Sequence, residues 1–383
     1  MIKISTRKAI DKYYASSALS QSTFKKLTGG LRNFKSPFKD TDSLKIGSAL
    51  DSILTAEEGD FEKIFHVSNL DKLPTDSIQA IMKTIRDSLI IQHSSIDGEI
   101  TDETIEKLNN VSFDIDNDEL NEVILNAVTK HNYYTNRKDE TRINDVKSAG
   151  KDFYFDLIGS LGKVILSSDE KVLLDKMVKN LRTNPATAKY FDRKKQKSFK
   201  KVLFHYQLPI YFTYQGLQCK ALLDLCIFIY NEKDEIIKIE PIDLKSTYED
   251  THRFSKVARS LRYDIQAAWY TTALDIAYRS VLFPNAEIAP FKFIVESTTN
   301  PGEPVLYVAS EQFLRVGKEG RKAVYLTDTN FSFNGNSPDS IVVKPAIRGY
   351  EELVDEYVFY QMNGTEKERV LQENNNVLTL DID

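Results

Sequence analysis

Cysteine and histidine are scarce in this chain of 383 residues, which contains two cysteines and five histidines. Two thiols cannot supply the four ligands of an iron–sulfur cluster, so we expect no such cluster. Cys219 and Cys226 lie beside or inside an apolar run, and we interpret them as packed thiols in a reducing compartment. The histidines are scattered without the spacing of metal ligands, so we interpret each of them as structural.

Long apolar runs and glycine-rich phosphate loops are also missing. A membrane-spanning helix needs about 20 apolar residues, and no run in the sequence approaches that length. No signal-peptide pattern opens the chain, and no glycine-rich loop suggests the use of ATP. We therefore expect a soluble protein of the cytoplasm that has neither a membrane partner nor a nucleotide cofactor.

Excess positive charge is absent as well, because 51 Lys and Arg stand against 56 Asp and Glu, a formal net charge of −5. A nucleic-acid-binding protein with this balance must concentrate its positive charge locally. Hydrophobic residues make up 41% of the chain, which is enough for a substantial core in one large domain or two.

The stretch 220–247 organises the rest of the chain. Residues 221–230 are almost continuously apolar and rich in β-branched and aromatic side chains, a pattern typical of a strand buried on both faces. Residues 231–235 are polar, and a second apolar strand follows from Ile236. The sequence therefore predicts a β-hairpin.

Three charged side chains stand out in this hairpin. Asp224 interrupts the first strand, and Asp243 and Lys245 lie at the end of the second. Residues two apart in a strand share a face, so Asp243 and Lys245 point the same way. If the register brings Asp224 opposite, two carboxylates and an ammonium converge. A buried carboxylate is costly unless it is compensated, and Mg²⁺ or Mn²⁺ would do so through its preference for oxygen ligands.

These residues resemble a known nuclease motif. Asp224 and, on the next strand, Asp243, Leu244 and Lys245 look like the PD-(D/E)xK signature. The usual proline before the first acid is replaced by Leu223. The tripeptide alone would indicate only a salt bridge at the end of a strand, and the buried acid and the hairpin favour the nuclease interpretation.

A second segment narrows the resemblance. Residues 263–270 are similar to the Tyr-x-x-Gln-x-x-x-Tyr segment of the RecB-like and RecE-type branch, which includes exonuclease VIII-like and lambda-exonuclease-like phage enzymes. The resemblance covers residues 167–310 and, in part, residues 20–60.

The resemblance implies an α/β fold, in which a restriction-endonuclease-like core with a mixed central sheet flanked by helices follows a mainly helical N-terminal half. It implies a Mg²⁺- or Mn²⁺-dependent DNA exonuclease that leaves a 5′ phosphate and a 3′ hydroxyl. In this family the two acids bind metal, the lysine positions or activates water, and the glutamine and tyrosine lie near the scissile strand. The corresponding residues here are Asp224, Asp243, Leu244 (through its backbone carbonyl), Lys245, Gln266 and Tyr270.

Two positions depart from the family pattern. Asp51 stands where RecE-type enzymes have a histidine, and it is either an additional metal ligand or an acid on the surface of a helix. Gln207 is the nearest polar candidate on the strand where relatives place a glutamate ligand. An amide oxygen binds metal more weakly than a carboxylate, which favours a glutamine on the strand surface. Glu296 could neighbour the site but is not a standard ligand.

Basic residues gather in two places that could contact DNA phosphates. A run of charge is usually a solvated face, but the first group leads into the core and the second follows the motif at helical spacing. The first group comprises Arg193, Lys194, Lys195, Lys197, Lys200 and Lys201, and the second comprises Arg253, Lys256, Arg259 and Arg262.

The order of motifs suggests three regions. Residues 1–190 form a mainly helical N-terminal region with an insertion at about 70–150, which either caps the site or makes subunit contacts. Residues 191–330 form the nuclease core, and residues 331–383 form a C-terminal extension with strand and helix. Helices are expected to begin near Ser20, Ser43, Thr75, Asp116, Ser167 and Thr251 and to cover 350–357, and further strands are expected at 202–213, 291–296 and 305–308.

The family resemblance also implies biological context. It suggests resection of double-stranded DNA ends in phage recombination or replication, in the host cytoplasm, by a homo-oligomer with a single-strand annealing protein as partner. Two alternatives stay open. One is a structure-specific endonuclease, and the other is a catalytically degenerate nuclease fold that binds DNA or serves in the virion.

Overall fold

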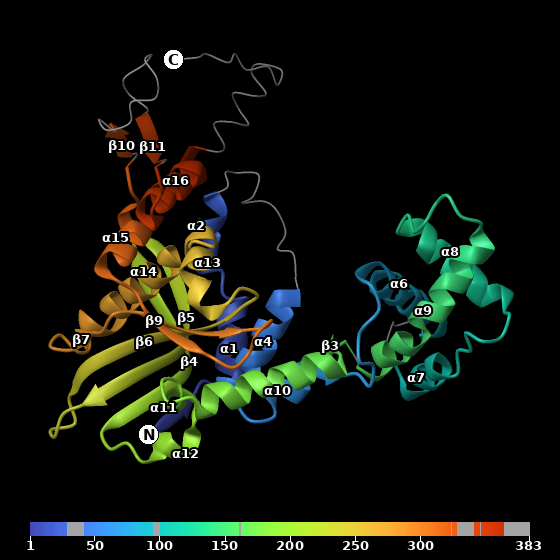
Figure 1. The fold of residues 1–383 in the computed structure, drawn as a ribbon, viewed down its shortest axis with the longest axis horizontal. Coiled ribbons are helices and arrows are strands. Elements are labelled where there is room, and N and C mark those ends of the chain that lie inside the picture. The colour runs from blue at the N-terminus through green and yellow to red at the C-terminus, as the bar shows by residue number, and fades with distance from the viewer. Residues whose placement is uncertain are drawn as a thin grey trace, which may run out of the picture. The chain divides into compact units, whose positions relative to one another are not determined.

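The computed structural model describes residues 1–28, 42–94, 100–160, 162–322, 324–327, 341–344 and 346–363. The chain divides into two compact units, drawn in Figure 1. The first comprises Met1–Gly47, Leu54–Glu57 and Lys179–Asp383, and the second comprises Ser48–Ile53 and Glu58–Val178. The insertion predicted at about 70–150 lies inside the second unit, which extends beyond it on both sides.

A mixed sheet forms the centre of the first unit, in agreement with the predicted α/β class (Figure 1). Strands β4, β5 and β6 are antiparallel, β6 and β8 are parallel, and β8 and β9 are antiparallel. The strands in spatial order are β1 (Ile2–Ile4), β4 (Val202–Tyr214), β5 (Leu217–Tyr230), β6 (Ile236–Thr247), β8 (Lys292–Ser297) and β9 (Val305–Val308), and β7 (Glu287–Ile288) also pairs with β6.

Turn chemistry explains how the long strands reverse. Gln215 and Gly216 both have positive φ, 48° and 78°, between the paired residues Tyr214 and Leu217. A two-residue turn with two left-handed residues matches the twist of antiparallel strands. The β5–β6 connection is the predicted polar segment, and the Asn231 side chain accepts hydrogen bonds from main-chain amides within it. The predicted hairpin is confirmed.

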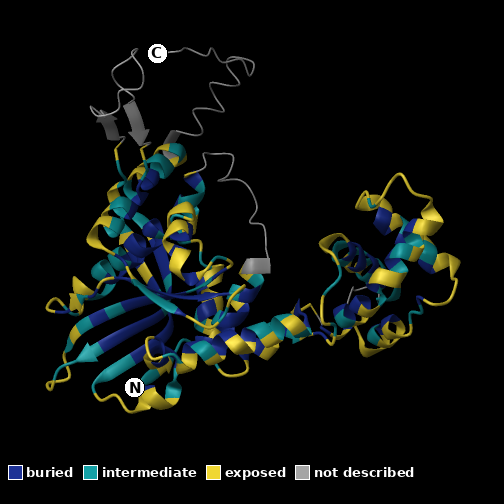
Figure 2. Ribbon diagram, viewed as in Figure 1, coloured by how far each residue is buried: buried dark blue, intermediate teal, exposed yellow. Residues whose placement is uncertain are grey.

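Helices pack against this sheet around one aromatic centre. The buried Trp269 has ring centroids of Phe24, Phe212 and Tyr350 within 5.1–5.2 Å, and Figure 2 shows the buried interior. Ile265 is also fully buried in this core. The helices of this unit are α1 (Arg7–Ala15), α2 (Gln21–Leu27), α11 (Ala188–Phe191), α12 (Arg193–Lys197), α13 (Phe254–Ser260), α14 (Tyr263–Leu274), α15 (Glu311–Glu319) and α16 (Tyr350–Asn363).

The second unit is mainly helical and has its own core. The helix expected to begin near Asp116 is confirmed, and five apolar residues of this helix, α8, are buried. Its elements are α5 (Asp60–Ile64), β2 (Phe65–Val67), α6 (Asp76–His93), α7 (Asp102–Asn109), α8 (Asp118–Lys130), α9 (Asp139–Gly159) and β3 (Val164–Leu166). Helices α4 (Asp42–Leu54) and α10 (Ser168–Thr183) contribute residues to both units.

Two helix predictions need correction. The helix expected from Thr251 is a 3-10 turn (Thr251–Arg253) and two helices, because Arg262 adopts a left-handed φ of 53° that ends α13 before α14 begins. The C-terminal helix expected over 350–357 continues to Asn363. Within the described residues, no helix combines the length and the apolar character that a membrane span requires.

Candidate active site

The candidate site lies where the pairing of β5 with β6 ends. The last paired residues are Leu225 and Ile242, after which β5 continues along β4 and β6 continues along β8. At this point the Asp224 carboxylate accepts a hydrogen bond of 2.8 Å from the Leu244 amide. The Asp224 side chain thus takes the place of a main-chain carbonyl as the acceptor for the Leu244 amide. The next register position places Asp224 opposite Asp243, as the predicted convergence requires.

Asp243 is almost fully buried, with 2% of its surface exposed, and two side chains stabilise its charge. Lys245 forms an ion pair with it, which confirms that the two residues share a face. The Gln266 amide donates a 2.7 Å hydrogen bond to the other carboxylate oxygen. Burial raises the pKa of Asp243, whereas Lys245 and Gln266 favour the ionised form.

The Lys245 ammonium is held in its charged form. Burial alone would lower its pKa, but the nearby Asp243, Tyr263 and Asp224 outweigh that effect and raise the pKa above its ordinary value. A lysine in this state does not take up a proton at neutral pH. In this form it can orient water and neutralise negative charge, and its role in positioning or activating water stays a prediction.

Helix α14 supplies the predicted glutamine and tyrosine. Gln266 and Tyr270 are one turn apart on the same helix, and both are buried beside the acids. Burial raises the pKa of Tyr270 well above its ordinary value, and the charges of Tyr13 and Asp243 add to the effect. The Tyr270 phenol therefore stays protonated and can act only as a neutral group near the site.

Tyr263 and Lys25 are site residues for which the sequence predicted no role. The Lys245 ammonium lies over the Tyr263 ring, 5.0 Å from its centroid, and the Lys25 ammonium of α2 lies over the same ring at 5.1 Å. Tyr263 opens the motif segment and could have been singled out. Lys25 is remote in sequence, and only the packing of α2 brings it here.

Gln207 and Asp51, the two residues that depart from the family pattern, lie in different parts of the structure. Gln207 is buried, with a left-handed φ of 50°, and donates a 2.5 Å hydrogen bond to Thr55. The expected position on the strand surface is therefore wrong, because the side chain is buried and bonded to the turn that follows α4. Gln207 lies opposite Asp224 in the strand register, between two paired positions. Asp51 belongs to the part of α4 assigned to the second unit, and its role as a ligand stays a prediction.

Helix α4 also approaches the motif strand closely. A Cβ atom added at Gly47 would lie 3.0 Å from the Ser246 hydroxyl oxygen, directly after Lys245. This contact explains why α4 has a glycine at position 47. Glu296, on the neighbouring strand, is fully buried and accepts hydrogen bonds from the amides of Ser297 and Gly302. It shapes the loop after β8.

The donor set can be tested against a divalent ion. Two carboxylates meet at the end of the β5–β6 pairing, but no group of three or more His, Cys, Asp or Glu in the described ranges is placed to hold a metal. An ion there would have Asp224, Asp243 and the Leu244 carbonyl as protein ligands and would keep several waters. Mg²⁺ is commonly bound in this way. The ammonium of Lys245 must then move away from Asp243.

The first basic group is divided by the structure. Arg193 serves the fold, since its guanidinium donates to the Leu54 carbonyl at 2.9 Å and lies 3.8 Å from the Tyr206 ring centroid. Lys201 pairs with Asp234. The remaining members are exposed and available to solvent: Lys194, Lys195, Lys197 and Lys200.

The second basic group does not form one continuous stripe. Arg253, Lys256 and Arg259 are exposed on the 3-10 turn and α13. Arg262 departs from them because it lies beyond the helix break, pairs with Asp264 at 2.9 Å and donates to the Arg348 carbonyl. Its predicted place on the stripe is therefore wrong.

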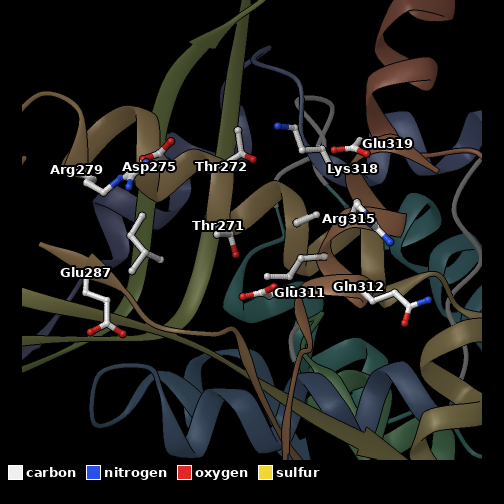
Figure 3. Close-up of a pocket in the computed structure, with 13 residues that line it drawn as sticks. Thr271, Thr272, Asp275, Arg279, Glu287, Glu311, Gln312, Arg315, Lys318 and Glu319 are labelled. Carbon is white, nitrogen blue, oxygen red and sulfur yellow. Dashed lines mark hydrogen bonds and ion pairs between the residues drawn. The ribbon is translucent and has the colours of Figure 1, made fainter. Parts of the chain in front are cut away.

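A cavity of about 760 Å³ lies between α14 and α15 (Figure 3). Thr271 and Thr272 line it from α14, and Glu311 and Arg315 line it from α15. Neither Asp224 nor Asp243 lines it, and its charges have both signs. It does not supply the chemistry of the acidic site.

Comparison with known proteins leaves the family unassigned. No protein-family model matches this chain, and no curated protein sequence matches it. Among solved structures, the chain is similar to the crystal structure of a candidate exonuclease from Eubacterium rectale. The identity is 14%, the TM-score is 0.27, and the match covers 63% of this chain and 77% of that chain. A likeness of this size assigns neither family nor function.

Proposed function

We propose that this chain is a metal-dependent deoxyribonuclease of the PD-(D/E)xK type that acts as an exonuclease on double-stranded DNA. One observation carries the proposal. Asp224 and Asp243 meet where the pairing of two strands ends, and Lys245 contacts the more buried of the two acids. Burial of a carboxylate to this degree is costly unless a cation compensates its charge. The motif resemblance supports the same assignment.

Asp224, Asp243 and the Leu244 carbonyl would hold Mg²⁺ or Mn²⁺. When bound, such an ion would polarise the phosphate and lower the pKa of a coordinated water. Gln266 keeps the Asp243 carboxylate oriented through its amide hydrogen bond. These side chains come from strands and a helix in the core, which are rigid elements suited to a precise site.

Lys245 acts on the water and the phosphate. Its ammonium would orient the attacking water and neutralise the charge that develops on the phosphate oxygens. The oxygen of the water bonds to phosphorus and the water gives up one proton to solvent, while the bond to the leaving 3′ oxygen breaks and that oxygen takes up a proton from solvent. The products are a 5′ phosphate and a 3′ hydroxyl.

Exposed cations would hold the DNA backbone on either side of this site. The net charge of the chain is negative, so binding depends on these local groups. The candidates are Lys194, Lys195, Lys197, Lys200, Arg253, Lys256 and Arg259. The family resemblance further supports action at DNA ends in phage recombination or replication, a homo-oligomeric state and a single-strand annealing partner.

The test uses linear and covalently closed duplex DNA with Mg²⁺, Mn²⁺ or a chelator. Wild-type protein should degrade only the linear DNA, and only with metal. Asp243→Asn should abolish degradation, whereas Asp234→Asn, in the exposed connection between β5 and β6, should not. Cutting of the closed circle would establish an endonuclease instead. No hydrolysis of either substrate with either metal would refute the enzymatic proposal.

A further inference from the structure

Lys25 presents an uncompensated cation beside the candidate site. Its ammonium lies 5.1 Å from the Tyr263 ring centroid, and Lys245 lies over the same ring at 5.0 Å. The two nitrogen atoms are therefore no farther apart than these two distances together. Within the described part of the chain, no hydrogen bond or ion pair engages the Lys25 ammonium.

The nearby acids are engaged elsewhere. Asp243 is bound by Lys245 and Gln266, and Asp264 is bound by Arg262. An aromatic ring offsets only part of the cost of a partly buried cation. Burial and the positive charge of Lys245 lower the pKa of Lys25 to about 8, which is consistent with the missing counter-charge.

The position of Lys25 is fixed by the core. On α2, Phe24 and Leu27 are fully buried, and the Phe24 ring lies 5.1 Å from Trp269. Ser20 forms a capping box with Thr23 at the start of the helix. A long side chain on a well-anchored helix points at the site, so its placement does not depend on a flexible loop.

We propose that Lys25 binds a backbone phosphate of the DNA strand that enters the nuclease site, next to the phosphate that faces Lys245. This inference rests on the proposed function and adds to it a residue outside the motif. A phosphodiester supplies the anion that the described residues do not supply. The ammonium acts as a point charge that contacts substrate, and Tyr263 separates it from Lys245 in the unbound protein.

The test compares Lys25→Met and Lys25→Arg with Lys12→Met, an exposed lysine on α1. A fluorescently labelled duplex is titrated in Ca²⁺ at several salt concentrations, and cleavage is then measured in Mg²⁺. Lys25→Met should weaken binding about tenfold and reduce the slope of log affinity against log salt by about 0.9. KM should rise more than kcat falls. Lys25→Arg should restore most of the affinity, and Lys12→Met should behave as wild type.

The outcomes separate this inference from the proposed function. If wild type cleaves DNA but Lys25→Met has an unchanged salt slope and KM, the Lys25 assignment fails and the nuclease proposal stands. A lowered melting temperature with an unchanged salt slope would show a structural role and would also overturn it. If wild type binds DNA without cleaving it and Lys25→Met reduces the slope of log affinity against log salt, Lys25 binds phosphate and the nuclease proposal fails. Absence of binding by wild type would overturn both.

Discussion

At the scale of single residues, the site is a balance of charges around one buried carboxylate. The Asp243 carboxylate pairs with the Lys245 ammonium and accepts a hydrogen bond from the Gln266 amide, so both of these partners are protein groups. Asp224 is less buried and is tied to the Leu244 amide. The two acids therefore differ in their surroundings, although they share one register position. Their proximity requires a cation, and Lys245 is the cation present in the protein itself.

Competition between Lys245 and a bound metal can be measured. Lys245→Met removes the ammonium from Asp243, leaves the carboxylate uncompensated and should raise the affinity for Ca²⁺ by about tenfold, or about 1.4 kcal/mol. The same variant should lose cleavage in Mg²⁺. Calorimetric titration with Ca²⁺ measures the first effect, and Lys238→Met, on the same strand, serves as control. Equal or weaker Ca²⁺ binding would contradict a metal position beside Asp243.

Much of this site follows from local periodicity. The two-residue repeat of a strand places Asp243 and Lys245 together, and the helical repeat places Gln266 and Tyr270 together. These relations depend on a few neighbouring residues, so sequence reveals them. Lys25 could not be found in this way, because its approach to Tyr263 depends on how α2 packs in the core.

At the scale of elements, α14 supplies Gln266 and Tyr270 to the site, and α15 packs against α14. A Cβ atom at Gly317 of α15 would lie 2.0 Å from the Asp264 carbonyl oxygen. Backbone cannot retreat as a flexible side chain can, so this contact requires glycine. Asp264 is two positions before Gln266, and the contact sets where α14 begins.

Gly317→Ala should therefore destabilise the protein by about 1–3 kcal/mol, the usual cost of overpacking. It should also lower cleavage, because a shift of α14 moves Gln266 away from Asp243. Urea unfolding gives the first quantity, and DNA digestion gives the second. Gly302→Ala is the matched control, since an added Cβ there meets nothing within 4 Å. If Gly317→Ala matches that control, the close approach of the two helices is not essential.

The predictions of helices and strands were right where the apolar pattern is long and wrong where a helix is interrupted. The hairpin of β5 and β6 was predictable from its continuous apolar strands and polar connection. The break between α13 and α14 was not, because Arg262 is an ordinary helix former whose left-handed backbone is stabilised by distant partners such as Arg348. The buried place of Gln207 likewise depends on Thr55, which is far away in sequence.

At the scale of the whole molecule, each of the two compact units has a hydrophobic core of its own among the described residues. The first unit has the core around Trp269, and the second has a core of α6, α8 and α9 residues that includes Ile81. The apolar pattern of the insertion predicted two of its helices, α6 and α8, but neither α7 nor α9. The division itself was not predictable, because α4 and α10 each contribute to both units.

Ile81→Ala should destabilise the second unit selectively by about 2–5 kcal/mol. Hydrogen exchange of α8 and α9 amides should accelerate, whereas exchange of β4 and β5 amides should stay unchanged. Ile265→Ala, an equally buried residue in the first unit, should have the reverse effect. Acceleration throughout both units in either variant would show a single cooperative unit.

The most direct test of the central claim is a single-turnover measurement of phosphodiester hydrolysis in Mg²⁺ on a linear duplex. Wild type and the Asp234→Asn control should hydrolyse it at similar rates and release products with 5′ phosphates. Asp224→Asn, Asp243→Asn and Lys245→Met should each be slower by at least about a thousandfold, or about 4 kcal/mol in activation free energy. Hydrolysis that survives in all three variants would show that the catalytic centre lies elsewhere.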